Sequence, residues 1–177
     1  MSSIILGVDP GLQNTGYAIL KHDSSKTQVV DFGYLKLDSS KEIAMRIETF
    51  YAFFTQKITE IQVTHIAIET PFLGKNAQTF LKLGYLRGIL YLLAQLNKCQ
   101  LSEFAPREVK MAVTGFGAAS KEQVSTMMLR MFQGLNTVKA TARADVTDAL
   151  AVSVCGLFAL KNTSLDKRIH SLQQKQR

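Results

Sequence analysis

The chain has 177 residues, of which 46% are hydrophobic and 20% are charged. This apolar content suits one folded domain of ordinary size and excludes a chain that is mainly disordered. Lysine and arginine outnumber aspartate and glutamate by 21 to 14, and the net charge of +7 favours a polyanionic partner, either a nucleic acid or a membrane surface.

The first part of the chain predicts three strands followed by a helix. Apolar or alternating runs predict strands at residues 4–9, 15–21 and 28–37, with a hairpin loop at 23–26. Apolar residues recur every three or four positions over 39–61, which predicts an amphipathic helix with Ser40 as its cap.

The rest of the chain alternates between predicted helices and strands. Strands are expected at 65–69 and 100–104, and helices at 77–96, from Pro106 to the glycines at 115 and 117, at 120–133 and at 142–160. Helix 77–96 is apolar nearly all round, which is typical of a buried helix or of an interface. Together the elements predict an α/β fold with a five-stranded mixed sheet flanked by helices.

The domain boundary is expected near residue 160. Residues 1–160 carry all the predicted strands and helices, so we expect them to form one domain with one core. Residues 161–177 are polar and basic, and we expect a tail that is partly disordered.

No stretch of the sequence predicts membrane insertion or secretion. The longest nearly apolar run, residues 149–160, is shorter than the about 20 residues that a membrane-spanning helix needs. No basic leader precedes the first apolar run, so a signal peptide is not expected. Cys99 and Cys155 lie in apolar surroundings without C-x-x-C spacing, so we expect reduced thiols in a cytoplasmic protein.

The excess positive charge lies in the middle of the sequence. Residues 70–143 contain 10 basic and 3 acidic residues, whereas residues 1–69 contain 6 basic and 8 acidic residues. Any one of these basic side chains can simply be a solvated residue on the exposed face of a helix. Their concentration in one segment favours a basic surface for a nucleic acid.

Four acidic residues stand where a carboxylate needs a partner. Asp9 and Glu69 each end a short apolar run that predicts a buried strand, and a lone carboxylate is costly to desolvate there. Asp145 and Asp148 are three residues apart on a largely apolar helix, so their side chains share one face. A cation between such acids removes the cost of desolvation and the mutual repulsion.

These acids favour a site for hard divalent cations. Carboxylate oxygens suit Mg²⁺, with Mn²⁺ as a substitute, and no cluster of histidine and cysteine suggests zinc. Two such ions about 3.5–4 Å apart can activate water and stabilise the leaving oxygen of a phosphodiester. Beside a basic segment, the four acids therefore indicate metal-dependent chemistry on a polyanion. Each acid alone also fits an ordinary role, such as favourable placement at the start of a helix.

Short motifs surround the four acids. They are Gly7-Val8-Asp9-Pro10-Gly11 with Thr15-Gly16-Tyr17, Ile68-Glu69 with Phe72 and Lys75-Asn76-Ala77, Lys82-Leu83-Gly84 with Arg87-Gly88, and Ala144-Asp145 with Asp148-Ala149-Leu150-Ala151. In this order and at this spacing they resemble the RuvC family of Holliday junction resolvases, nucleases of the RNase H-like superfamily. The resemblance covers about residues 3–160.

The resemblance implies a fold, an activity and a set of site residues. It implies an RNase H-like fold, a homodimer, Mg²⁺-dependent symmetric nicking of four-way junction DNA in recombination and repair, and cooperation with the RuvA–RuvB branch-migration machinery. Asp9, Glu69, Asp145 and Asp148 match the family's catalytic, metal-binding acids. The residues implied at the DNA are Phe72, Lys75, Asn76, Lys110 and Lys121, of which Phe72 matches an aromatic that engages bases near the junction centre.

Three other interpretations remain at this point. The glycines around Asp9 also resemble the phosphate loop of the sugar-kinase and actin superfamily, although 177 residues leave little room for its second lobe. The related YqgF-type nuclease group is closer, but the Lys75-Asn76-Ala77 block and the length favour the RuvC family. A non-catalytic DNA-binding module would explain the basic segment but not the four acids.

Overall fold

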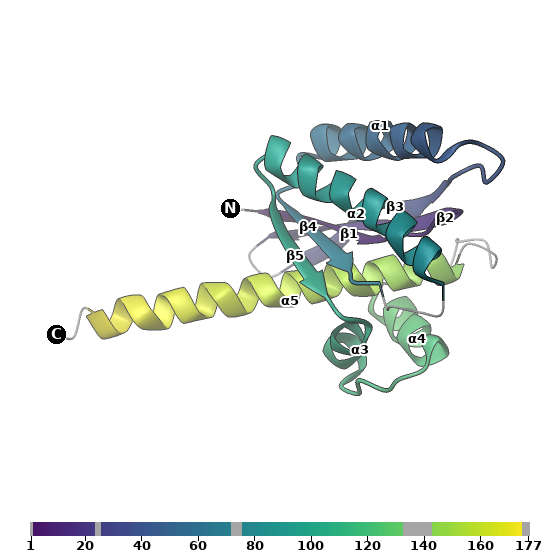
Figure 1. Cartoon of the computed structure of the whole chain (residues 1–177). Helices are drawn as coiled ribbons and strands as arrows, with labels where there is room; N and C mark the ends of the chain where they lie inside the picture. The colour runs from purple at the N-terminus through teal and green to yellow at the C-terminus, as the bar shows by residue number, and fades with distance from the viewer. Residues whose placement is uncertain (1, 24–25, 72–75, 133–142, 175–177) are drawn as a thin grey trace.

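The computed structural model describes the backbone of residues 2–23, 26–71, 76–132 and 143–174, and the side chains of these residues up to 162 except that of Arg143. The elements are β1 (Ser3–Asp9), β2 (Asn14–Asp23), β3 (Lys26–Lys36), α1 (Ile43–Ile61), β4 (His65–Glu69), α2 (Ala77–Leu96), β5 (Gln100–Phe104), α3 (Pro106–Thr114), α4 (Lys121–Met131) and α5 (Arg143–Gln174). Figure 1 shows one sheet between two layers of helices, with α1 and α2 on one face and α5, α3 and α4 on the other.

The sheet has five strands in the order β3-β2-β1-β4-β5. β1, β2 and β3 pair antiparallel, whereas β4 pairs parallel with both β1 and β5. The predicted mixed sheet flanked by helices is therefore confirmed. Its central strands are buried on both faces, which explains why β1 and β4 are continuous apolar runs.

Two glycines let α5 lie directly on the sheet. A Cβ atom on Gly7 of β1 would lie 2.4 Å from the carbonyl oxygen of Ala149, and one on Gly16 of β2 would lie 2.1 Å from that of Asp145. Both distances are far shorter than a carbon–oxygen contact allows, so only glycine fits at either position. Ser153 is fully buried on the same face of the helix. The close packing brings the start of α5 against the ends of the first two strands.

Two helix ends differ from the prediction. The helix expected from residue 39 begins at Ile43, because the backbone N–H and the hydroxyl of Ser40 donate to Asp38 Oδ1 at 2.9 and 2.7 Å and form a turn instead. Ser40 therefore does not cap α1. The helix expected to end at residue 160 continues as α5 to Gln174, since residues 161–174 contain neither proline nor glycine to stop it.

The caps predicted for the shorter helices are confirmed. Pro106 occupies the first turn of α3, and Gly115 ends that helix in the left-handed region with φ of 76°. Ser120 and Gln123 form the reciprocal capping box of α4, with distances of 2.8 and 3.3 Å. These caps fix the α3–α4 hairpin that carries Lys110 and Lys121.

Within the described part of the chain, no helix is long and apolar enough to cross a membrane. Both cysteines are free thiols, Cys155 buried and Cys99 half-buried. Burial raises the pKa of both thiols, and that of Cys155 to about 11, so neither is a reactive thiolate at neutral pH.

Candidate active site

The first two acids lie at neighbouring strand ends. β1 and β4 run parallel with Val8 opposite Ile68, so Asp9 and Glu69 end the two strands at the same edge of the sheet. The carboxyl ends of parallel strands are where ligands bind on sheets of this kind. Asp9 is the more deeply buried of the two carboxyls.

The start of α5 brings the other two acids to this edge. In the β1–β2 ladder Asp9 is paired with Gly16, the residue on which the backbone of Asp145 rests. Asp148 follows one turn later, and the charges of both acids raise the pKa of Asp9, so both lie near the end of β1. The parallel pairing and the close packing of α5 thus bring Asp148 to the same cavity as Asp9 and Glu69, whereas Asp145 is not among the residues that line this cavity.

Three of these acids line one cavity with two lysines. The cavity has a volume of about 230 Å³, and its charged lining consists of Asp9, Glu69, Asp148, Lys110 and Lys121. Lys110 comes from α3 and Lys121 from α4, the two helices that lie beside the start of α5 in Figure 1. The cavity therefore combines anionic groups that suit cations with cationic groups that suit a phosphate.

Burial and repulsion by neighbouring acids raise the pKa of the two strand-end acids. Burial, and then the charge of Asp148, raise the pKa of Asp9 to about 6, although Lys121 opposes the shift. Burial, and then the charges of Asp9 and Asp148, raise the pKa of Glu69 to about 7, opposed by Lys121 and Lys110. Such shifts are typical of carboxylates assembled for a function rather than for stability.

Lys121 provides the direct counter-charge of the site. Its Nζ donates to Asp148 Oδ2 at 3.0 Å, and this hydrogen bond raises the pKa of Lys121. The Lys121 side chain is 76% exposed, whereas that of Asp148 is 17% exposed. A long, exposed lysine can leave a buried carboxylate at small cost when another cation or anion arrives.

The acids present fit hard divalent cations by their chemistry. They offer only carboxylate oxygens, the donors that Mg²⁺ and Mn²⁺ prefer. Among the side chains that the structure describes, no three of histidine, cysteine, aspartate or glutamate lie close enough to hold one ion together. Lys121 bonds to Asp148 in this arrangement, so a cation at Asp148 would compete with Lys121.

The residues predicted at the DNA have different outcomes. Lys110 and Lys121 lie beside the acids, as above. Asn76 caps α2, and its Oδ1 accepts a hydrogen bond from the Thr79 N–H at 3.1 Å, so this side chain has a structural task. Phe72 and Lys75 lie outside the described residues.

One charged residue near the acids had no role assigned from the sequence. Arg87 of α2 lines a second cavity, of about 220 Å³, that also contains Asp9 and Glu69. The available signal was an arginine in a helix that is otherwise nearly free of charge, but the sequence does not show which side of α2 meets the strand ends.

This mixed sheet with helices on both faces is the RNase H-like fold, which Holliday junction resolvases of known structure share. The model of the family "Crossover junction endodeoxyribonuclease RuvC" matches residues 5–156. The chain belongs to the RuvC family, whose members are metal-dependent nucleases.

Similar proteins are known from several bacteria. The RuvC of Chlorobium phaeobacteroides is 44% identical over 159 residues, which cover 90% of this chain and 83% of the relative. That of Legionella pneumophila is 33% identical over 153 residues, 86% of each chain. Membership of the RuvC family decides against the sugar-kinase and actin superfamily, the alternative that the glycines around Asp9 left open.

Two solved structures share the fold at low sequence identity. Thermus thermophilus RuvC in complex with a Holliday junction substrate has a TM-score of 0.81 and 20% identity, over 91% of this chain and 96% of that chain. The yeast mitochondrial Holliday junction resolvase has a TM-score of 0.64 and 14% identity, over 86% of this chain and 77% of that chain.

Proposed function

We propose that the protein resolves Holliday junctions by divalent-cation-dependent nicking of two DNA strands, and so acts in recombination and repair. The observation that carries this proposal is the cavity in which Asp9, Glu69 and Asp148 face Lys110 and Lys121. Carboxylates without cations would repel a phosphate, and lysines without carboxylates would only bind it. Family membership and the matched length of the relatives support the junction as substrate.

The residues of the chain divide the work between holding cations and holding the strand. Asp9, Glu69, Asp145 and Asp148 are the proposed ligands of two Mg²⁺ ions per site, with Mn²⁺ as a substitute. When bound, such ions supply an activated water and neutralise charge on the leaving oxygen. Lys110 and Lys121 hold the scissile phosphate.

The connection between β4 and α2 is the proposed contact with the junction centre. It begins directly after Glu69 and contains Phe72, Lys75 and Asn76. An aromatic side chain there can stack on an unpaired base, which contributes about 1–3 kcal/mol. The lysine adds a phosphate contact that does not depend on sequence.

The test is cleavage of a labelled four-way junction beside a linear duplex of the same sequence. We expect paired, symmetric nicks in the junction with Mg²⁺ or Mn²⁺, none with EDTA, and at least tenfold slower cleavage of the duplex. Junction binding without cleavage under either ion would instead favour a DNA-binding module. Absence of any preference for the junction would contradict the proposal.

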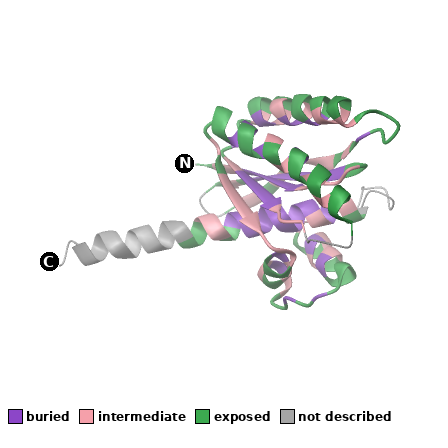
Figure 2. Ribbon diagram, in the orientation of Figure 1, coloured by how far each residue is buried: buried purple, intermediate pink, exposed green. Residues whose placement is uncertain are grey.

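The outer face of α2 supports a homodimer. α2 is apolar nearly all round, yet its outer side is exposed, as Figure 2 shows. Large apolar residues on this side are Leu81, Tyr85, Leu92 and Leu96, between 46% and 61% exposed. Gly88 lies among them with no atom near its Cβ position, which leaves room for a second helix. Two copies related by a twofold axis match the near-twofold symmetry of a junction.

Replacing Leu92 by Glu is expected to weaken the dimer at least tenfold, because it places a charge in the apolar face. Light scattering after size-exclusion chromatography measures the mass at several concentrations. Met45→Glu on α1 is the matched control, since Met45 is 48% exposed but lies on another helix. Equal masses for wild type and Leu92→Glu at every concentration would argue against α2 as the interface.

The remaining proposals rest on family membership. We infer cooperation with the RuvA–RuvB machinery, and a cytoplasmic place of action on bacterial DNA, because the matched relatives are bacterial RuvC proteins. Residues 1–160 are the proposed nuclease domain, which the match over 5–156 supports. Residues 161–177 contain 5 basic residues and 1 acidic residue, and we propose that they form a basic extension.

A further inference from the structure

The acids lie between two cavities rather than in one. The cavity with Lys110 and Lys121 shares Asp9, Glu69 and Pro106 with the cavity that Arg87 lines. A DNA strand that crosses the acids therefore meets two lysines on one side and an arginine on the other. The mechanism proposed above uses only the lysine side.

The second cavity has room for a compact group and has one cation, Arg87, beside Asp9 and Glu69 in its lining. Its volume of about 220 Å³ is several times the roughly 30 Å³ of a water molecule, which leaves room for a sugar-phosphate group. Three prolines and Leu83 form much of its wall and offer no hydrogen-bond donor. The Thr70 hydroxyl already donates to the Phe104 carbonyl at 3.3 Å. Arg87 is the one cationic residue in this lining.

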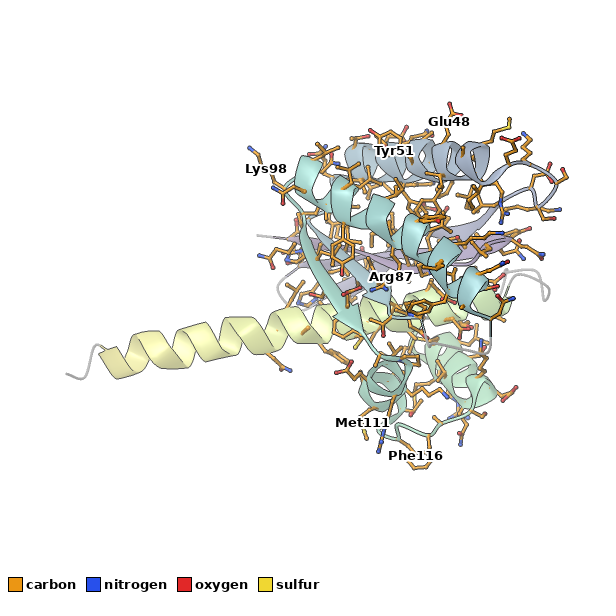
Figure 3. The ribbon with its side chains drawn as sticks, in the orientation of Figure 1. Glu48, Tyr51, Arg87, Lys98, Met111 and Phe116 are labelled. Atoms are coloured by element: carbon orange, nitrogen blue, oxygen red, sulfur yellow. The ribbon has the colours of Figure 1, made fainter. Side chains whose placement is uncertain are left out.

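Arg87 is fixed by an ion pair, but one nitrogen of its guanidinium has no partner among the described residues. Its guanidinium pairs with Glu103 of β5, and its side chain is 20% exposed. Figure 3 shows Arg87 between α2 and β5. Burial would raise the pKa of Glu103, but hydrogen bonds with Tyr91 and Arg87 hold it below its usual range. Arg87 Nε is buried and has no hydrogen-bond partner among the described residues. An unpaired, buried donor of a charged group is costly unless a ligand satisfies it.

Arg87 is paired with Glu103 and not with the acids whose cavity it shares. The charges that shift the pKa of Asp9 are those of Asp148, Lys121 and Asp145, and those that shift the pKa of Glu69 are those of Asp9, Asp148 and the two lysines. The arginine therefore does not neutralise the carboxylates directly. A group that spans the cavity can bond with the guanidinium at one end while the neighbouring phosphate lies at the acids.

We propose that Arg87 binds the phosphate next to the scissile one, in the cavity that it shares with Asp9 and Glu69. The proposal rests on the proposed nuclease function. Glu103 and Tyr91 act as positioning residues that orient the guanidinium. The arginine then fixes the strand on the side of the acids opposite Lys110 and Lys121, so that the strand is held at two points across the bond to be cut.

The first test is the salt dependence of junction binding in EDTA, where no cleavage takes place. Each phosphate contact contributes about 0.9 to the slope of log K against log salt, so Arg87→Met is expected to lower that slope by about 0.9 and affinity by about tenfold. Lys57→Met is the matched control, because Lys57 is also ion-paired, with Asp31, and similarly exposed at 23%. It should leave the slope unchanged.

Two further variants separate phosphate binding from a merely structural tether. Glu103→Gln removes the charge that orients the guanidinium but keeps the arginine, so it should lower thermal stability and lower the slope by clearly less than Arg87→Met does. Arg87→Lys should retain most of the slope. If Glu103→Gln lowers the slope as much as Arg87→Met does, or if Arg87→Met leaves it unchanged, the proposal is wrong.

The second test replaces single phosphates of the junction by uncharged methylphosphonates on either side of the mapped cleavage site. One adjacent position should lose affinity with wild type but not with Arg87→Met, because the two changes remove the same contact. Additive effects at both positions would overturn the assignment. A wild-type protein that neither prefers nor cleaves junctions would instead overturn the proposed function, so the two failures are distinguishable.

Discussion

Replacing Asp9 by Asn is expected to slow junction cleavage on the order of 1,000-fold while junction binding in EDTA is kept or strengthened. Asp9 lines the cavity, and the charges of Asp148 and Asp145 raise its pKa, so an amide there removes charge that the cations need. It also removes charge that repels phosphate, which is why binding should not weaken. Single-turnover cleavage with Mg²⁺ and binding with EDTA measure the two effects.

Asp31→Asn is the matched control for this prediction. Asp31 is an aspartate of β3 that pairs with Lys57 at 2.6 Å, away from the cavity. Its replacement should cost some stability and leave cleavage within about twofold once the protein is folded. Cleavage by Asp9→Asn at the wild-type rate would remove Asp9 from the catalytic set, whatever the other acids do.

Asp9→Asn is expected to slow cleavage but to stabilise the metal-free protein above about pH 6. The folded-state pKa of Asp9, about 6, lies above its ordinary value of 3.8, so the folded protein binds this proton more tightly than the unfolded chain does. The stability of the metal-free protein should therefore fall as pH rises from about 4 to about 6 through Asp9, and further to about 7 through Glu69. At pH 8, Asp9→Asn should be more stable than wild type by about 1–3 kcal/mol.

Thermal unfolding in EDTA at pH 4.5 and pH 8 checks this sign. The advantage of Asp9→Asn should shrink at pH 4.5, where most of the wild-type carboxyl is protonated. Cleavage should change in the opposite direction and rise with pH through 6 to 7, because ionised carboxylates are needed to hold cations. A variant that is less stable than wild type at pH 8 would show that the carboxylate stabilises the fold instead.

The strand-end acids could be predicted from the sequence because their signal is local. A continuous apolar run that ends in an acid predicts both a buried strand and a carboxylate at its end, as it does for Asp9 and Glu69. The helix over 77–96 and the capping box at Ser120 also depend on nearby residues only, and both are confirmed. Gly16 could be recognised as part of a sequence motif. The reason that glycine is required there could not be predicted, because it is the contact with α5, a helix more than a hundred residues later in the chain.

The sequence does not predict which side chains of distant elements contact one another. The ion pairs Lys121–Asp148 and Arg87–Glu103 each join two elements whose relative placement no periodicity gives. The length of α5 was missed for a related reason. The sequence after residue 160 loses its apolar pattern, which suggested an end, yet a helix stops only where a residue or a cap stops it.

Replacing Gly16 by Ala is expected to lower the free energy of unfolding by about 1–3 kcal/mol and to slow cleavage about 100-fold. The added methyl group would lie 2.1 Å from the carbonyl oxygen of Asp145, so α5 must move away by about 1 Å to restore a normal contact. That shift moves Asp145 and Asp148 relative to Asp9, and a displacement of this size at the reacting groups is enough to cause such a loss. Chemical denaturation and single-turnover cleavage measure the two effects.

Gly84→Ala is the control for the stability part of this prediction. Gly84 lies inside α2 with no atom near its Cβ position, so the same substitution should stabilise the protein by up to about 1 kcal/mol through helix propensity. Opposite signs for the two variants would show that Gly16 is required by the approach of α5 and not by its backbone freedom. If Gly16→Ala keeps both stability and cleavage, the position of Asp145 does not depend on this contact. The acids of α5 would then have to be held by the other contacts of the helix, at Gly7 and in the core beneath it.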